Sequence, residues 1–121
     1  MGSSALILII EDDAATRELM GNVLMDEGYD VVLAESGASA LTQLDLVLPD
    51  LITLDLGLFD IDGLALLHML RQRAETSTIP IVVVSARGAL PHDAFALSQA
   101  QVAKPFDLED LLGAVRAVLG G

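Results

Sequence analysis

The stretch that decides the fold is DLITLDLGLFDIDGLALLHML, residues 50–70. It places an apolar run, 51–54, directly before Asp55, and a loop rich in acids and glycine leads from Asp55 to a longer apolar segment, 64–73. A short apolar run that stops at a polar residue is typical of a buried strand, and the longer segment has the length of a helix. We therefore predict a strand, a loop and a helix in succession, with Asp55 at the carboxyl end of the strand.

The same strand-then-helix pattern is repeated along the chain. The predicted strands are 5–10, 31–34, 51–54, 81–84 and 101–103, and the predicted helices are 14–27, 37–48, 64–73, 92–99 and a last one capped by Asp107. Five such units in a small domain predict an α/β fold, a doubly wound (βα)5 sandwich with helices on both faces of a five-stranded parallel sheet. In such sheets the working site lies at the carboxyl ends of the strands.

Length and hydropathy indicate one domain outside the membrane. The chain has 121 residues, and although 53% are hydrophobic, its longest apolar run is 5–10, far short of the ~20 residues that span a bilayer. No basic segment precedes that run, so we do not expect a secretory signal. We interpret residues 1–4 as a flexible start or an expression remnant, and we predict that the domain spans 5–119.

The charge balance narrows the choice of partners. Eighteen acidic residues stand against six basic ones, a net charge of −12. Nucleic acids and anionic membranes attract clustered Lys and Arg, so neither is a predicted partner, whereas a metal cation or a basic protein surface fits. The chain has no cysteine, which excludes disulfides and cysteine-ligated zinc, and its histidines, His68 and His92, lie far apart. We expect a cytoplasmic protein.

Polar side chains follow four of the predicted strands at the point where each strand ends: Glu11-Asp12-Asp13, Asp55, Ser85 and Lys104. Taken singly, these residues have simple interpretations as helix caps, turn residues or surface charges. Taken together, they bring carboxylates, a hydroxyl and an ammonium to one end of the sheet. Crowded carboxylates repel one another unless a cation neutralises them, and Mg²⁺ suits a site of this composition. These are also the parts that phosphoryl transfer onto an aspartate requires, with Asp55 as the nucleophile.

Four segments resemble the receiver domains of bacterial two-component response regulators, similar to the chemotaxis receivers: LILIIEDDAATR (6–17), LITLDLGLFDIDG (51–63), IPIVVVSA (79–86) and VAKPF (102–106). The resemblance covers essentially the whole domain. It implies the flavodoxin-like strand order 2-1-3-4-5. The 43 residues from Asp12 to Asp55 and the 30 from Asp55 to Ser85 are ordinary for the family.

The resemblance also implies a role for each residue of the site. Glu11 and Asp12 would be the metal-binding pair, with Asp13 a neighbouring helix-start residue. Asp55 would be the phosphorylated residue and a metal ligand. The remaining implied positions are the Gly57 carbonyl for Mg²⁺, Ser85 and Lys104 for the phosphoryl group, Ala86 as the small residue that leaves it room, and Arg87 as a side chain that tunes access. A cis Lys104–Pro105 bond is implied as well.

Three features depart from the family. Phe59 stands where a proline often follows the phospho-acceptor, and Gln101 replaces an aromatic residue three positions before the lysine. The 19 residues from Ser85 to Lys104 are fewer than the resemblance implies, so we expect a truncated fourth helix or a remodelled link after it. Because the hydroxyl and the aromatic residue work together in the family, we expect a non-standard readout face on the fourth helix, fifth strand and fifth helix.

The leading hypothesis is a phospho-accepting signalling module and not an enzyme acting on separate substrates. A histidine kinase or phosphotransfer protein would supply the phosphoryl group, and autodephosphorylation would remove it. Because no effector domain follows Leu119 in this sequence, output is expected through a partner such as a downstream effector, through a homodimer, or through a further domain of a longer natural protein.

One other hypothesis remains open, and the sequence argues against two more. A receiver-like interaction domain that works without phosphorylation is the main alternative, suggested by Gln101 and the short spacing after Ser85. An aspartate-dependent phosphatase would carry a second aspartate where this chain has Gly57. A flavin-binding protein would need a phosphate-binding loop after the first strand, where Glu11-Asp12-Asp13 would repel the phosphate.

Overall fold

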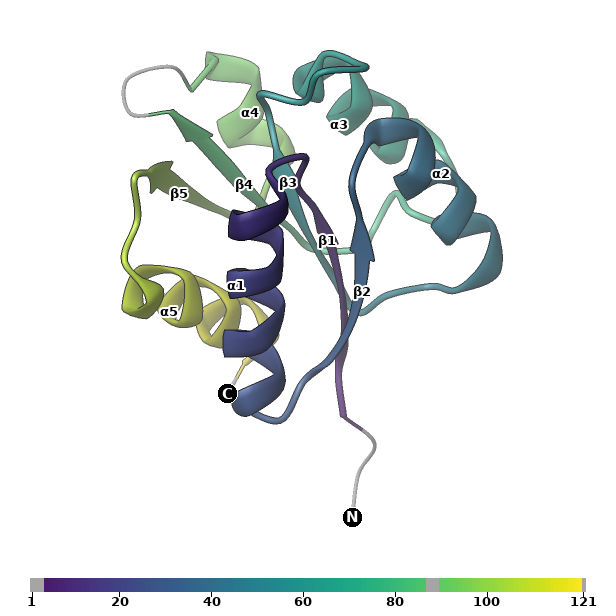
Figure 1. Cartoon of the computed structure of the whole chain (residues 1–121). Coiled ribbons are helices and arrows are strands. Elements are labelled where there is room, and N and C mark those ends of the chain that lie inside the picture. The colour runs from purple at the N-terminus through teal and green to yellow at the C-terminus, as the bar shows by residue number, and fades with distance from the viewer. Residues whose placement is uncertain (1–3, 87–89, 121) are drawn as a thin grey trace.

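Strands and helices alternate along the chain, as predicted (Figure 1). The computed structural model describes residues 4–86 and 90–120. The strands are β1 (Leu6–Ile10), β2 (Asp30–Ala34), β3 (Leu51–Asp55), β4 (Ile81–Ala86) and β5 (Ala100–Lys104). The helices are α1 (Ala14–Asp26), α2 (Gly37–Leu46), α3 (Gly63–Gln72), α4 (His92–Leu97) and α5 (Leu108–Leu119).

All strand pairs are parallel, and the order in the sheet is β2-β1-β3-β4-β5. Helices α1 and α5 cover one face, and α2, α3 and α4 cover the other (Figure 1). Alternate side chains of each strand therefore enter two separate cores: in β1, Leu8 and Ile10 pack under α2 and α3, and Ile7 and Ile9 pack under α1 and α5. The doubly wound fold and the order 2-1-3-4-5 are confirmed.

Two predicted helix ends are wrong by two residues, and both errors have a local cause. Helix α2 ends at Leu46 because Val47 is already extended (φ −140°, ψ 153°), and Leu48 cannot readily be helical before Pro49. Helix α4 ends at Leu97 because Ser98 is extended and the next amide, that of Gln99, donates to the Ile81 carbonyl at 2.9 Å. In both cases the chain leaves the helix before its apolar spacing ends.

Side-chain caps fix where the helices begin. The carboxylates of Asp13, Asp62 and Asp107 accept hydrogen bonds from the first turns of α1, α3 and α5, and the predicted cap of the last helix at Asp107 is confirmed. Helices α1 and α5 each begin four residues after the preceding strand ends, and α3 begins eight residues after β3 ends. The caps thereby hold short, defined connections at the carboxyl end of the sheet.

The strand order reverses between β1 and β3, which run side by side in the centre of the sheet. Every side chain of β3 is buried, including that of Asp55 at its end. Within residues 4–86 and 90–120, no helix combines the length and the apolar character that crossing a membrane requires.

Candidate functional site

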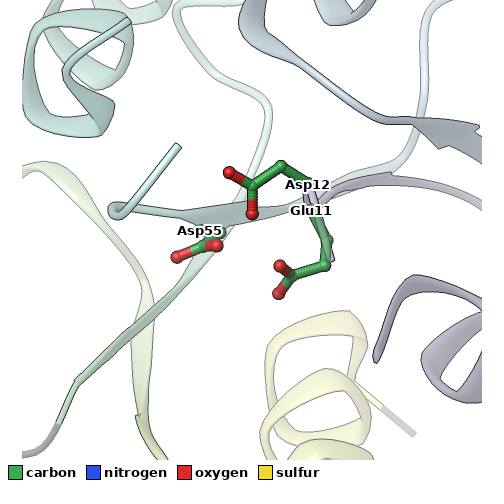
Figure 2. A group of neighbouring side chains, drawn as sticks. All are labelled: Glu11, Asp12 and Asp55. Atoms are coloured by element: carbon green, nitrogen blue, oxygen red, sulfur yellow. The ribbon is translucent and has the colours of Figure 1, made fainter. Parts of the chain in front are cut away.

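Three carboxylates meet where β1 and β3 end (Figure 2). Glu11 and Asp12 directly follow β1, and Asp55 is the last residue of the neighbouring strand β3. One oxygen from each carboxylate lies within 4.8 Å of the others. The register of two adjacent parallel strands therefore brings together residues that are more than forty positions apart in the sequence.

Lys104 contacts two of these carboxylates from the end of β5. Its Nζ lies 2.9 Å from Glu11 Oε1 and donates to Asp55 Oδ2 at 3.2 Å. Burial alone would lower the pKa of Lys104, but the contacts with Glu11 and Asp55 outweigh it and raise that pKa above its usual value. The ammonium is therefore firmly charged and offsets part of the negative charge of the cluster.

Glu11 is the most buried of the three acids, with 1% of its surface exposed. Its Oε2 accepts from the Asp13 amide at 3.1 Å, whereas Oε1 has the short ion pair with Lys104 but no contact with hydrogen-bond geometry. Burial raises the pKa of Glu11, and the lysine and the Asp13 amide only partly oppose this. A buried carboxylate oxygen with spare acceptor capacity beside two further carboxylates is a donor set that fits a hard divalent cation.

Asp55 is held by one contact on each oxygen. The Gly57 amide donates to Oδ1 at 2.9 Å, and Lys104 donates to Oδ2. The side chain is 5% exposed, so its orientation is fixed by these contacts and by the end of the strand. Asp55 is thus a carboxylate oriented before any ligand arrives.

The hydroxyl predicted for the site lies at the end of the next strand. Ser85 and Ala86 close β4, one and two positions beyond Val84, which is paired with Asp55. They line a cavity of about 240 Å³ together with Gly57 and residues of the connections around α3 and α4: Leu56, Asp62, Leu64 and Pro91. Open space therefore exists on the β4 side of the acidic cluster.

The side chain of Gln101, the residue predicted to be atypical for the family, points toward the end of α4. Its Nε2 donates to Ser98 Oγ at 3.0 Å, and that hydroxyl in turn donates to the Ala94 carbonyl in α4. Residues Gln101 to Ala103 and Asp110 line a separate hollow of about 330 Å³ between β5 and the first turn of α5. Gln101 is thus hydrogen-bonded to the residue that directly follows the six-residue helix α4.

The structure also involves residues that the sequence did not single out. Arg17, in the first part of α1, donates from Nη1 to the Glu11 carbonyl at 2.9 Å and to the Asp12 carbonyl at 3.4 Å. The Asp60 carboxylate accepts hydrogen bonds from two backbone amides at the start of α2. The only sequence signal for Arg17 was its place one turn into a helix that follows the acids. Predicted residue Arg87 lies outside the described residues, and the predicted cis Lys104–Pro105 bond is confirmed.

A match to a known protein family identifies the domain that carries this site. The model of the response regulator receiver domain matches residues 7–116. The chain belongs to this family. The matched residues include all five strands except Leu6, the first residue of β1, so the match and the observed fold describe the same unit.

Relatives and solved structures agree with the assignment. The receiver domain is 36% identical over 116 residues to the phosphate regulon transcriptional regulatory protein PhoB of Klebsiella pneumoniae, covering 93% of this chain and 51% of the relative. It is 37% identical to the transcriptional regulatory protein KdpE of Staphylococcus aureus, covering 93% of this chain and 48% of that protein. The chain thus spans about half the length of these curated relatives. A CheY-like receiver domain from Methylobacillus flagellatus has a TM-score of 0.87 at 30% identity, with 96% of this chain and 99% of that chain covered.

Proposed function

We propose that this receiver domain accepts a phosphoryl group on Asp55 and uses the phosphorylated state as a signal. The observation that carries the proposal is the single cluster formed by Glu11, Asp12, Asp55 and Lys104 at the carboxyl end of the sheet. In that cluster Asp55 is the carboxylate that both a backbone amide and the lysine orient.

The residues that would hold Mg²⁺ are Glu11, Asp12 and Asp55 with their carboxylates, and Gly57 with its backbone carbonyl. The fit rests on three converging carboxylates and on the buried Glu11 oxygen that lacks a hydrogen bond. When bound, Mg²⁺ supplies positive charge that neutralises the oxygens of the transferred phosphoryl group.

In the proposed transfer, an Asp55 oxygen attacks the phosphorus of a phosphohistidine on a partner protein. The new P–O bond forms as the P–N bond breaks, and the electron pair and a proton go to the departing imidazole. Lys104 and the Ser85 hydroxyl donate hydrogen bonds to the phosphoryl oxygens, and the small side chain of Ala86 leaves room for them. For this contact Lys104 must exchange Glu11 and Asp55 for the phosphoryl group.

The signal ends by hydrolysis at the same site. Water attacks the phosphorus, the P–O bond to Asp55 breaks, and inorganic phosphate leaves with the carboxylate restored. The domain is therefore self-modifying and regulatory, and it does not turn over a separate substrate.

The proposed partners follow from this chemistry. A histidine kinase or a phosphotransfer protein supplies the phosphoryl group in the cytoplasm, and a homodimer or a downstream effector receives the signal. We also propose residues 5–119 as the receiver domain.

A second candidate is a receiver domain that acts through protein contacts without phosphorylation. The observation that favours it is the hydrogen bond from Gln101 to Ser98. This bond holds the residue at the proposed switch position in contact with the end of α4. The intact acidic cluster favours the phosphorylated form of the proposal over this one.

Intact-protein mass spectrometry tests the proposal. The protein is incubated with a small acyl phosphate, with Mg²⁺ or with a chelator, as wild type and as Asp55→Asn. We expect one added phosphoryl group in the wild type with Mg²⁺ only, and none in the variant. An unmodified wild type that also fails to bind Mg²⁺ would favour the phosphorylation-independent candidate.

A further inference from the structure

The loop between β3 and α3, residues 56–62, is closed at its base; we call it the acceptor loop. The Gly63 amide donates to the Leu56 carbonyl at 3.3 Å, and a Cβ on Gly63 would lie only 2.3 Å from Leu56 Cα. The two ends of the loop are therefore in backbone contact. Leu58, within the loop, is buried against the core.

The far side of the acceptor loop is bonded to the start of α2. Asp60 Oδ1 accepts from the Gly37 amide at 2.9 Å, and Oδ2 accepts from the Ala38 amide at 3.0 Å. Amides in the first turn of a helix have no partner within the helix, and a carboxylate there also interacts favourably with the helix dipole. The helix has its own cap as well, because Ser36 Oγ accepts from the Ser39 amide at 3.0 Å. The hydrogen bonds from α2 to Asp60 are therefore additional to the cap that Ser36 already provides.

Apolar contact accompanies these hydrogen bonds. A Cβ on Gly37 would lie 2.2 Å from Ile61 Cγ2, so only glycine allows the acceptor loop to approach α2 this closely. Ile61 is partly buried against the same core as α2 and α3. The hydrogen bonds of Asp60 lower its own pKa below the usual aspartate value, which is consistent with a carboxylate that stays ionised in this contact.

The acceptor loop also carries the peptide that contacts Asp55. The Gly57 amide donates to Asp55 Oδ1, and Gly57 is three residues from Asp60. Phe59 stands between them where a proline would stiffen the loop, and its side chain is 76% exposed, so packing of this residue does not fix the loop. The contacts of Asp60 therefore restrain the acceptor loop next to the position where this chain has Phe59 and not a stiffening proline.

We propose that Asp60 is a positioning residue: by fastening the acceptor loop to the first turn of α2, it holds the Gly57 peptide against Asp55. Asp60 is not one of the three acids whose oxygens converge within the described residues, so its effect on the metal site is indirect. This inference rests on the proposed function, since the Gly57 carbonyl is a proposed ligand of Mg²⁺.

Two variants of the full chain separate this role from a general effect on α2. Asp60→Ala removes the loop contact, and Ser36→Ala removes the helix's own cap while leaving the contact in place. Amide hydrogen exchange of the metal-free proteins and Mg²⁺ affinity by calorimetry are measured for both. We expect Asp60→Ala to accelerate exchange of the Gly57 amide about fivefold and to weaken Mg²⁺ binding about tenfold, as loss of an outer-shell partner does. We expect Ser36→Ala to change neither by more than about twofold.

Asp60→Asn serves as the conservative variant. It retains one acceptor oxygen, so both its Gly57 exchange rate and its Mg²⁺ affinity should lie between those of wild type and Asp60→Ala. Unchanged Gly57 exchange in Asp60→Ala, or equal weakening of Mg²⁺ binding by Asp60→Ala and Ser36→Ala, would overturn the positioning role. A wild type that binds no Mg²⁺ would overturn both the proposed metal site and the effect of Asp60 on it. Exchange at Gly57 would still report separately on whether Asp60 fastens the loop.

Discussion

Lys104 Nζ lies 3.2 Å from Asp55 Oδ2, although the two residues end strands β5 and β3, which are separated in the sheet by β4. The same ammonium lies 2.9 Å from Glu11 Oε1 at the end of β1. One side chain thus joins the ends of three strands. Within residues 4–86 and 90–120, it is the cation that forms ion pairs with the acidic cluster.

Removing this cation is expected to destabilise the metal-free fold. Lys104→Met removes the charged partner that the described residues provide for the buried carboxylates of Glu11 and Asp55, at an expected cost of about 1–3 kcal/mol in the free energy of unfolding at neutral pH. Urea unfolding with a chelator present measures the cost. Added Mg²⁺ should restore part of the loss, because a ligand that binds only the folded state stabilises it.

A matched control for Lys104→Met is Arg73→Met. Arg73 forms an ion pair with Asp45 at 3.3 Å, but the aspartate side chain is 72% exposed, and such surface pairs contribute at most about 1 kcal/mol. Equal destabilisation by the two variants would contradict the view that Lys104 compensates a buried cluster.

Substitution by alanine should have opposite effects on stability at two glycines, Gly63 and Gly113. Gly63→Ala places a Cβ 2.3 Å from the Leu56 backbone, which cannot move without opening the base of the acceptor loop, so we expect a loss of at least about 2 kcal/mol. Gly113 lies within α5 and a Cβ there meets nothing within 4 Å, so Gly113→Ala should stabilise by about 0.5–1 kcal/mol. Thermal unfolding compares them. A tolerated Gly63→Ala would show that the loop base is not tightly closed.

Arg71 connects α3 to the short α4 and to the entrance of β5. Its Nε donates to the Leu97 carbonyl at 2.9 Å, and Nη2 donates to Gln99 Oε1 at 2.9 Å. Nη1 donates to the Ile79 carbonyl at 2.7 Å, among other carbonyls of the turn after α3. This planar fork of donors holds the ends of three segments at once.

We expect Arg71→Lys to fail to replace the arginine, because one ammonium cannot reach acceptors on three segments. It should cost about 1–3 kcal/mol in the free energy of unfolding and accelerate amide exchange in α4 and at Gln99. Arg116→Lys is the control, since Arg116 makes one exposed pair with Glu27. Exchange rates in α4 that match wild type would contradict this role of Arg71.

The contact of Asp60 with α2 has a pH signature. Its amide hydrogen bonds lower the pKa of Asp60 below the unfolded value of 3.8, so its contribution to stability is complete above that pH and is lost as the pH falls through the folded pKa. The difference in free energy of unfolding between wild type and Asp60→Asn should therefore shrink as the pH falls below 3.8. A carboxyl titration of Asp60 by NMR with an ordinary midpoint would contradict the contact.

The sequence predicted the fold because strands buried on both faces and helices with one apolar face leave different periods in the chain. It predicted the cluster because the residues at strand ends are brought together by any parallel sheet of this order. It could not predict the contacts of Asp60 and Arg71. Apart from Gln99 Oε1, which also accepts from Arg71, their partners are backbone amides and carbonyls, which nearly every residue has, so no residue type marks the acceptor or donor positions.

The helix ends at Leu46 and Leu97 were mispredicted for a related reason. Apolar spacing continues past both, and the chain leaves the helix because of Pro49 in one case and pairing with β4 in the other. The direction of Gln101 was equally hidden, since its bond to Ser98 depends on where the shortened α4 ends.

The most direct test of the central claim is to locate the phosphoryl group on the chain. After incubation with an acyl phosphate and Mg²⁺, reduction by borohydride converts a phosphorylated aspartate to homoserine, which peptide mass spectrometry places in the sequence. We predict homoserine at position 55 alone, and none when a chelator replaces Mg²⁺. Homoserine at position 12 or 13 instead, or an unmodified Asp55 in a protein that binds Mg²⁺, would contradict the account.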